Sequence, residues 1–203
     1  MGSSRSHWEA VYTMKTETAV SWYQPHPTLS LKFITAAAGR AAQIVDVGGG
    51  ASTLVDDLLA HGYEHVTVLD VAEAALAKVR ARLGARAPLV SWIAADITQW
   101  TPPRRYDVWH DRAFFHFLTQ PAQQASYLAA LTAGTQPGST VIMATFAPDG
   151  PDMCSGLPVQ RYSPDRLAKR FGPAFALTNH VEESHRTPGG AEQRFSYAVL
   201  KRV

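Results

Sequence analysis

The segment with the clearest chemical signature is a glycine-rich turn that follows a β-branched run. Asp46 lies near the end of the run, followed by Gly48, Gly49 and Gly50, with Ser52 just beyond. Glycine accepts positive φ and lets a ligand approach the backbone without a Cβ in the way. An apolar pattern of helical period follows, and the first turn of a helix offers unpaired N–H groups. A strand, turn and helix of this kind bind a nucleotide-like cofactor at the carboxyl edge of a parallel sheet.

Two further acids follow apolar segments downstream. Asp70 closes the β-branched run 66–69, and Asp96 follows the run 90–94. An acid after the second strand can accept hydrogen bonds from both hydroxyls of a ribose. The alternative is that Asp70 is a loop acid or a helix cap and Asp96 a turn aspartate. Given the glycine turn upstream, we favour ribose binding for Asp70 and a ligand contact for Asp96.

The spacing of the turn discriminates between cofactors. The dinucleotide fingerprint requires a glycine at position 53, where this chain has Thr53. The pattern Asp46-x-Gly48-x-Gly50-x-Ser52 resembles motif I of class I S-adenosylmethionine (SAM) methyltransferases. The resemblance implies SAM as the cofactor and S-adenosylhomocysteine as the product, with Asp46 reaching the methionine end. A nicotinamide-linked oxidoreductase is the weaker reading.

The same resemblance assigns the remaining cofactor contacts. It implies that Asp70 and Val71 lie at the ribose, that Asp96 contacts the adenine amino group, and that Ile97 packs beside the ring. We also place Asp111 beside the methyl group, because the fourth strand, which it ends, points there.

Methyl transfer requires little from the protein, because holding a nucleophile in line with the methyl supplies most of the effect. A base is needed only where the acceptor arrives protonated. We predict Asp111 and His116 as the catalytic polar groups, with His110 and His185 as further candidates. The alternatives are an ion pair of Asp111 with Arg112 and a structural, half-buried His116.

Two shorter resemblances concern the substrate. The segment 109–113, Trp-His-Asp-Arg-Ala, is similar to the fourth-strand segment of the thiopurine methyltransferase-like group. The segment 7–23 resembles the lead-in of eukaryotic methyltransferase-like enzymes that modify protein lysines. An Asn-Pro-Pro-Tyr motif, typical of enzymes that methylate bases or glutamine, does not occur in the sequence. The substrate is therefore a small molecule or, alternatively, a protein side chain; a non-catalytic SAM-binding module is a further alternative.

Strands that alternate with helices predict a parallel, doubly wound α/β sheet. We expect strands over 44–47, 66–70, 89–94, 106–111, 140–146, 175–181 and 194–200, and helices over 29–38, 54–61, 72–83 and 121–133 and from 164 onward. The resemblance implies a Rossmann-like seven-stranded sheet of order 3-2-1-4-5-7-6 with strand 7 antiparallel. We expect residues 1–203 to form a single domain.

Two segments outside the regular pattern are candidates for the substrate side. Residues 1–24 are predicted to form an amino-terminal lid, and 147–161 a long loop over the same edge. The substrate residues we predict are Trp8, Tyr12, Trp22, Cys154 and His185. Alternatively, the segment with Trp8, Tyr12 and Trp22 is an amphipathic helix packed on the domain, Cys154 is a small buried side chain, and His185 lies at the surface.

Composition limits the remaining classes. The chain has 203 residues, 46% of them hydrophobic and 18% charged, with a net charge of +2. This balance, without a basic block, gives no indication of a nucleic-acid partner. Cys154 is the single cysteine, and we expect no metal. In the absence of a membrane-spanning run or a signal peptide, we expect a cytoplasmic protein. The sequence leaves open whether it is a monomer or a homodimer.

Overall fold

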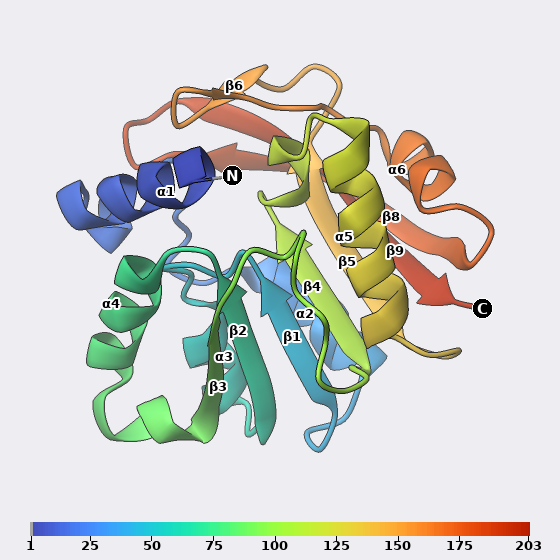
Figure 1. Cartoon of the computed structure of the whole chain (residues 1–203), viewed down its shortest axis with the longest axis horizontal. Coiled ribbons are helices and arrows are strands. Elements are labelled where there is room, and N and C mark those ends of the chain that lie inside the picture. Colours follow the sequence, from blue (N-terminus) through green and yellow to red (C-terminus); the bar gives the residue numbers. More distant parts are fainter. Residues whose placement is uncertain (1) are drawn as a thin grey trace.

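A computed structural model describes residues 2–203, with side chains from Arg5 onward. Within this part of the chain, a seven-stranded sheet has the order β3-β2-β1-β4-β5-β9-β8 (Figure 1). Its strands are β1 (Gln43–Val47), β2 (His65–Asp70), β3 (Val90–Ala94), β4 (Val108–Arg112), β5 (Thr140–Phe146), β8 (Phe175–Arg186) and β9 (Glu192–Arg202). The first five strands are parallel, and β9 is antiparallel to both β5 and β8. The predicted fold and strand order are confirmed.

Helices cover both faces of the sheet (Figure 1). They are α1 (Gly2–Met14), α2 (Thr28–Ala37), α3 (Leu54–Ala60), α4 (Glu73–Leu83), α5 (Pro121–Gly134) and α6 (Pro164–Phe171), with short 3-10 turns η1 (Glu17–Ala19), η2 (Gly84–Leu89) and η3 (Phe115–Phe117). Residues of α1 to α4 share one apolar cluster, and residues of α5 and α6 share the other. Strand β1 is buried at four of its five positions because helices pack on both of its faces.

The amino-terminal segment packs as part of the fold. Glu9 of α1 accepts hydrogen bonds from the backbone N–H groups of Glu73 (2.7 Å) and Ala74 (3.0 Å), and so caps the start of α4. Trp8 and Tyr12 are buried in the larger core cluster. Helix α1 is therefore a helix packed on the domain, as the alternative interpretation expected. It also lies at the carboxyl edge of the sheet, where a lid would lie.

Several predicted boundaries differ in the structure. The segment 147–161 is not entirely loop, because it contains a small hairpin of β6 (Met153–Cys154) and β7 (Leu157–Pro158). The last two strands are longer than predicted, so His185 lies within β8. Strand β4 starts at Val108, two residues later than predicted, and the Asp107 carboxylate just before it accepts the N–H of Gln43, 2.8 Å away.

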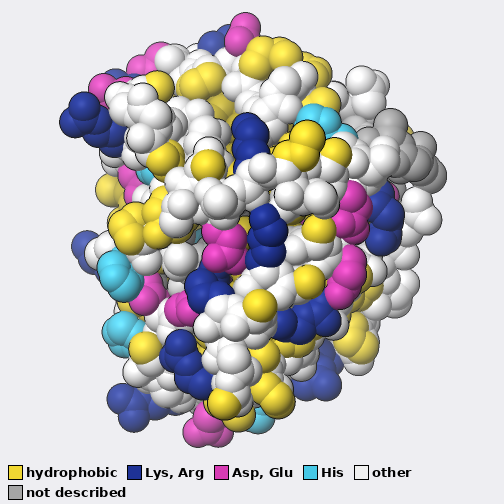
Figure 2. Space-filling view, turned by 90° about the vertical axis from the view of Figure 1, so that its left-hand side faces the viewer, with side chains coloured by type: hydrophobic (Ala, Val, Ile, Leu, Met, Phe, Trp, Pro, Cys, Tyr) yellow, Lys and Arg dark blue, Asp and Glu magenta, His cyan; other side chains and the backbone are white. Residues whose placement is uncertain are grey.

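The face formed by α1, α3 and α4 carries basic and acidic side chains intermixed rather than one patch of a single sign (Figure 2). Arg82 pairs there with Asp56 (2.7 Å) and with Glu17 (2.8 Å), joining η1 to α3 and α4. Among the described residues, no helix has the length and apolar character needed to cross a bilayer.

Candidate active site

The glycine turn after β1 is fixed to the neighbouring strand. The N–H groups of Gly48 and Gly49 donate to the carbonyl of Leu69, at 2.8 and 3.2 Å. Gly48 has a φ of +67°. A Cβ at Gly48 would lie 2.5 Å from Phe114 Cβ, and one at Gly50 would lie 2.5 Å from the Tyr12 hydroxyl. Gly48 and Gly50 therefore make room for the protein's own side chains, Phe114 and Tyr12.

Along the described carboxyl edge, three adjoining cavities form one groove. The largest has a volume of about 560 Å³. Its walls are Gly48, Leu69, Asp70, Val71, Ala95, Asp96, Ile97, Thr98, Phe114, Phe117, Leu118, Thr119, Gln120 and Gln123, closed by His7, Trp8, Leu157 and Pro158. The predicted contacts Asp70, Val71, Asp96 and Ile97 thus lie on one cavity.

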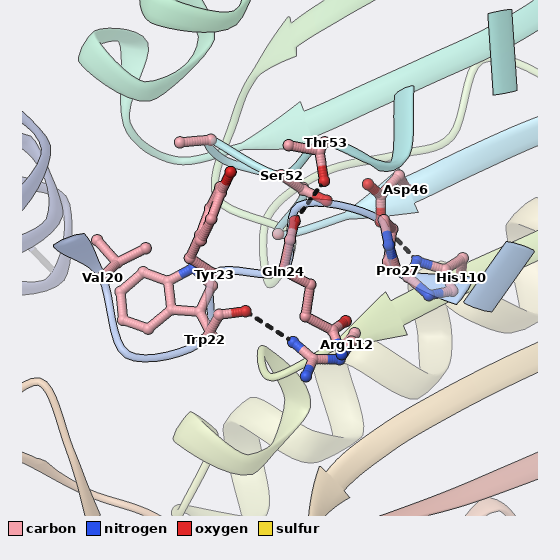
Figure 3. Close-up of a pocket in the computed structure, with 13 residues that line it drawn as sticks. Val20, Trp22, Tyr23, Gln24, Pro27, Asp46, Ser52, Thr53, His110 and Arg112 are labelled. Carbon is pink, nitrogen blue, oxygen red and sulfur yellow. Dashed lines mark hydrogen bonds and ion pairs between the residues drawn. The ribbon is translucent and has the colours of Figure 1, made fainter. Parts of the chain in front are cut away.

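The other two cavities continue the groove inward, and each has a volume of about 30 Å³. The middle cavity lies under Trp8, Tyr12 and Trp22. The inner cavity is lined by Val20, Trp22, Tyr23, Gln24, Pro27, Asp46, Gly48, Gly49, Ala51, Ser52, Thr53, His110 and Arg112 (Figure 3). All three include Gly48. Among the predicted cofactor residues, Gly50 and Asp111 line none of these described cavities.

Asp70 is a buried carboxyl group in the wall of the groove. Its Oδ1 accepts the N–H of Ala72 at 2.8 Å. Burial and, to a smaller extent, the nearby Asp46 raise the pKa of Asp70 to about 7, against the opposing effect of backbone N–H groups. Asp70 therefore changes charge near neutral pH, where a ligand that donates hydrogen bonds would favour the ionised form.

Asp96 makes the local contacts of a turn aspartate. Its Oδ1 accepts the N–H (2.9 Å) and the hydroxyl (2.7 Å) of Thr98. Both residues also line the largest cavity. The turn holds the carboxyl group at the cavity wall, so the structural and the functional readings of Asp96 are compatible.

The carboxylate of Asp111 contacts the protein itself. Its Oδ1 accepts the N–H groups of Phe114 (3.2 Å) and Phe115 (3.1 Å), and its Oδ2 accepts the hydroxyl of Tyr127, at 2.7 Å. Burial raises the pKa of Asp111 to about 7. Arg112 pairs with Glu183 on β8 rather than with Asp111, so the alternative of an ion pair between neighbours is wrong. We interpret Asp111 as the residue that holds the turn after β4.

His116 is buried among aromatic rings. Its Nδ1 accepts the backbone N–H of Phe146 at 3.3 Å, and its ring centroid lies 4.7 Å from that of Phe146. Burial, with a smaller contribution from Arg112, lowers the pKa of His116 to about 3. A neutral imidazole of such low basicity is poorly suited to accept a proton near pH 7.

The predicted substrate residues separate into two groups. Trp8, Tyr12 and Trp22 form an aromatic roof together with Phe117; the ring centroid of Trp8 lies 5.8 Å from that of Trp22 and 5.0 Å from that of Phe117. The roof covers the middle of the groove, because its members line the cavities beside Gly48.

Cys154 and His185 lie behind the roof and line none of the described cavities. The Nε2–H of His185 donates to the carbonyl of Ser21 at 2.7 Å, and Cys154 Sγ lies 4.0 Å from Ser21 Oγ. Burial raises the pKa of the Cys154 thiol and lowers the pKa of His185. Both residues therefore support the segment that carries Trp22.

Known proteins resemble this chain in sequence and in fold. The sequence model of a family described as "Methyltransferase domain" matches residues 44–138. The mouse (Mus musculus) eEF1A lysine and N-terminal methyltransferase is 27% identical over 99 residues, which are 47% of this chain; the match covers 14% of that relative.

Two solved structures cover nearly the whole chain. One, from work on the conversion of a disulfide bond into a thioacetal group during echinomycin biosynthesis, has a TM-score of 0.75 at 20% identity and covers 98% of this chain and 92% of that one. The other is the Burkholderia thailandensis 1,6-didemethyltoxoflavin-N1-methyltransferase with its acceptor and S-adenosylhomocysteine bound. It has a TM-score of 0.71 at 19% identity and covers 99% of this chain and 84% of that one. Residues 44–138 thus match a methyltransferase domain, and the sheet has the strand order of the class I methyltransferase fold.

Proposed function

We propose that this protein transfers the methyl group of SAM to a small, largely apolar acceptor. The main support is the groove covered by Trp8, Tyr12, Trp22 and Phe117, because a partly covered, aromatic-walled groove suits a small molecule. The Burkholderia neighbour, which holds a small acceptor and S-adenosylhomocysteine, supports this proposal.

The cofactor follows the groove in this proposal. Its adenosine occupies the largest cavity, with the ribose hydroxyls donating to Asp70 and the adenine beside Asp96 and Ile97. Its amino-acid end enters the inner cavity beside Asp46. The SAM sulfonium supplies an activated methyl group, and the protein positions the acceptor in line with it and excludes water.

The acceptor occupies the outer part of the largest cavity, between Trp8, Phe117, Leu157 and Pro158. His7 lines the same cavity, and its Nε2 is buried without a hydrogen-bond partner among the described residues. For an acceptor that arrives protonated, we assign proton removal to His7. Asp111 bonds within the protein, and His116 has a pKa lowered to about 3 and lines none of the three cavities of the groove.

Methyl transfer from labelled SAM tests the proposal directly. The purified chain is offered thiols, phenols and heteroaromatic amines in one panel and lysine-containing or N-terminal peptides in another. We expect label only in small acceptors. Label only in peptides would favour the second candidate, a protein methyltransferase, which the match to the mouse enzyme supports. Binding without turnover in either panel would favour a non-catalytic SAM-binding module.

The proposed ribose contact predicts that cofactor affinity depends on pH. Because burial raises the pKa of Asp70 to about 7, the ionised acceptor of the ribose hydroxyls is the minor form at pH 6 and the major form at pH 8. If only the ionised form binds, the dissociation constant of S-adenosylhomocysteine falls by up to about tenfold from pH 6 to pH 8. Calorimetry measures this. Asp70→Asn should remove the dependence, whereas Asp111→Asn should retain it; a flat wild-type profile would contradict the assignment.

We also expect the two covering segments to close on the cofactor. Amides of residues 8–24 and 147–160 should gain hydrogen-exchange protection when S-adenosylhomocysteine is added, while those of α6 stay unchanged. Deleting residues 1–24 would also remove the buried Trp8, Tyr12 and Val20. Trp22→Ala is therefore the sharper test and should lower turnover without unfolding the chain. Equal exchange with and without ligand, with activity retained in Trp22→Ala, would contradict a lid.

A further inference from the structure

Buried and half-buried polar residues lie around the inner cavity, and hydrogen bonds link them into an incomplete ring. On one side, His110 links Asp46 and Ser30: its Nδ1 lies 2.7 Å from Asp46 Oδ1, and its Nε2 lies 2.9 Å from Ser30 Oγ. The Ser30 hydroxyl is in turn hydrogen-bonded to the hydroxyl of Tyr197, at 3.2 Å. This half of the ring joins β1, β4, α2 and β9.

The other half passes through Arg112. Its Nε donates to the Tyr197 hydroxyl (3.0 Å), its Nη1 to the carbonyl of Trp22 (3.0 Å) and its Nη2 to Glu183 (3.2 Å). Gln24 Nε2 donates to the second carboxylate oxygen of Glu183, also at 3.0 Å. The segment 20–24, which follows α1, is thereby tied to β4 and to β8.

Thr53 forms the last link of this ring on the glycine-turn side, where its hydroxyl donates to the carbonyl of Gln24 at 2.7 Å (Figure 3). Figure 3 also shows Asp46 and Arg112 as separate members of the cavity wall, each with its own bonded partner. Asp46 is 3% exposed and the Arg112 side chain 8% exposed. The wall of the inner cavity therefore contains one buried acidic side chain, Asp46, and one buried basic side chain, Arg112.

This charge pattern complements an α-amino acid, whose ammonium suits Asp46 and whose carboxylate suits a guanidinium. The bonds of Arg112 described above use three of the five N–H groups that a guanidinium carries. We propose that the ring selects the cofactor by its amino-acid end, with Arg112 reading the carboxylate and His110, Ser30 and Tyr197 acting as positioning residues. This inference rests on the proposed function.

The ring also holds segment 20–24 over the inner cavity, so that this segment controls entry to it. The inner cavity, at about 30 Å³, has room for only one or two waters. An amino-acid end can enter only if the segment moves outward. The bonds that Gln24 and Trp22 make to Thr53, Glu183 and Arg112 are the ones that must break on entry and re-form afterwards.

Two ligands separate this role from general stability. S-adenosylhomocysteine has the amino-acid end, whereas 5′-methylthioadenosine keeps the adenosine and the sulfur but lacks it. In calorimetry, Arg112→Met should raise the dissociation constant of S-adenosylhomocysteine at least tenfold. The dissociation constant of 5′-methylthioadenosine should stay within about threefold of the wild-type value. Tyr197→Phe should show the same selectivity with a smaller loss. Binding of 5′-methylthioadenosine also verifies that each variant is folded.

A matched control comes from the same hairpin, where Arg194 on β9 pairs with Glu182 on β8 at the surface. Arg194→Met should change neither affinity. If Arg112→Met does not fold, the double variant Arg112→Met/Glu183→Gln removes both buried charges and is measured instead. Equal weakening of both ligands, or no weakening of either, would overturn the ring's role. If the wild type binds neither ligand, the proposed function fails and the inference fails with it.

Discussion

Replacing Asp70 with alanine is expected to weaken S-adenosylhomocysteine binding by about 1–3 kcal/mol, a 5- to 150-fold rise in the dissociation constant. Asp70 is 6% exposed and lines the largest of the three cavities in the groove. Its loss leaves both ribose hydroxyls in a buried site without their acceptor, and an unpaired buried polar group costs more than a hydrogen bond at the surface. Calorimetry at pH 8, where the carboxylate is mostly ionised, gives the largest difference.

The control for this experiment is Asp165→Ala, which removes an exposed carboxylate from the first turn of α6. It should leave the affinity unchanged. Asp70 also accepts the N–H of Ala72, so circular dichroism must show that the Asp70 variant is folded. A folded Asp70→Ala protein with wild-type affinity would place the ribose elsewhere.

Replacing Gly48 with alanine is expected to destabilise the protein by about 2–5 kcal/mol and to abolish cofactor binding. Two costs add. A residue with a Cβ at a φ of +67° costs about 1–2 kcal/mol. That Cβ would also lie 2.5 Å from Phe114 Cβ, and overpacking of this kind costs about 1–3 kcal/mol. Displacing Phe114 would move the wall shared by the middle and largest cavities.

Gly190 provides the matched substitution. Its φ is +85°, and a Cβ there would meet no atom within 4 Å. Gly190→Ala therefore carries the backbone cost alone, and urea unfolding of the two variants separates that cost from the clash. Equal destabilisation by both substitutions would mean that Phe114 adjusts freely, and that the turn does not require glycine for packing.

Local sequence patterns placed the predicted cofactor residues at one edge of the sheet. Asp70 ends β2 and Val71 follows it, while Asp96 and Ile97 come two and three residues after β3; the carboxyl ends of parallel strands meet at one edge. The positions of these residues therefore followed once the strands were recognised. The strand order followed from the resemblance to a known family, because periodicity alone does not specify which strands are neighbours.

Long-range pairings were decided only by the tertiary structure. Arg112 meets Glu183, and Gln24 meets the same carboxylate, across separations of 71 and 159 residues. The nearest sequence signal was the amino-terminal run of aromatic residues, which indicated a covering segment but not what would hold it in place. Charged residues far apart in a chain carry no pattern that identifies their partner.

The assignment of Asp111 shows the physical reason most directly. Successive side chains of a strand point to opposite faces, and on β4 His110 and Arg112 line the inner cavity while Trp109 and Asp111 bond to Tyr127 of α5. In a strand with one solvent-exposed face, the alternation of polar and apolar residues would identify the two faces. The first four residues of β4 are all buried, so its sequence has no such alternation. The sequence alone determined that strand β4 ends at the site, and the helices packed on its two faces decided which of its side chains enter it.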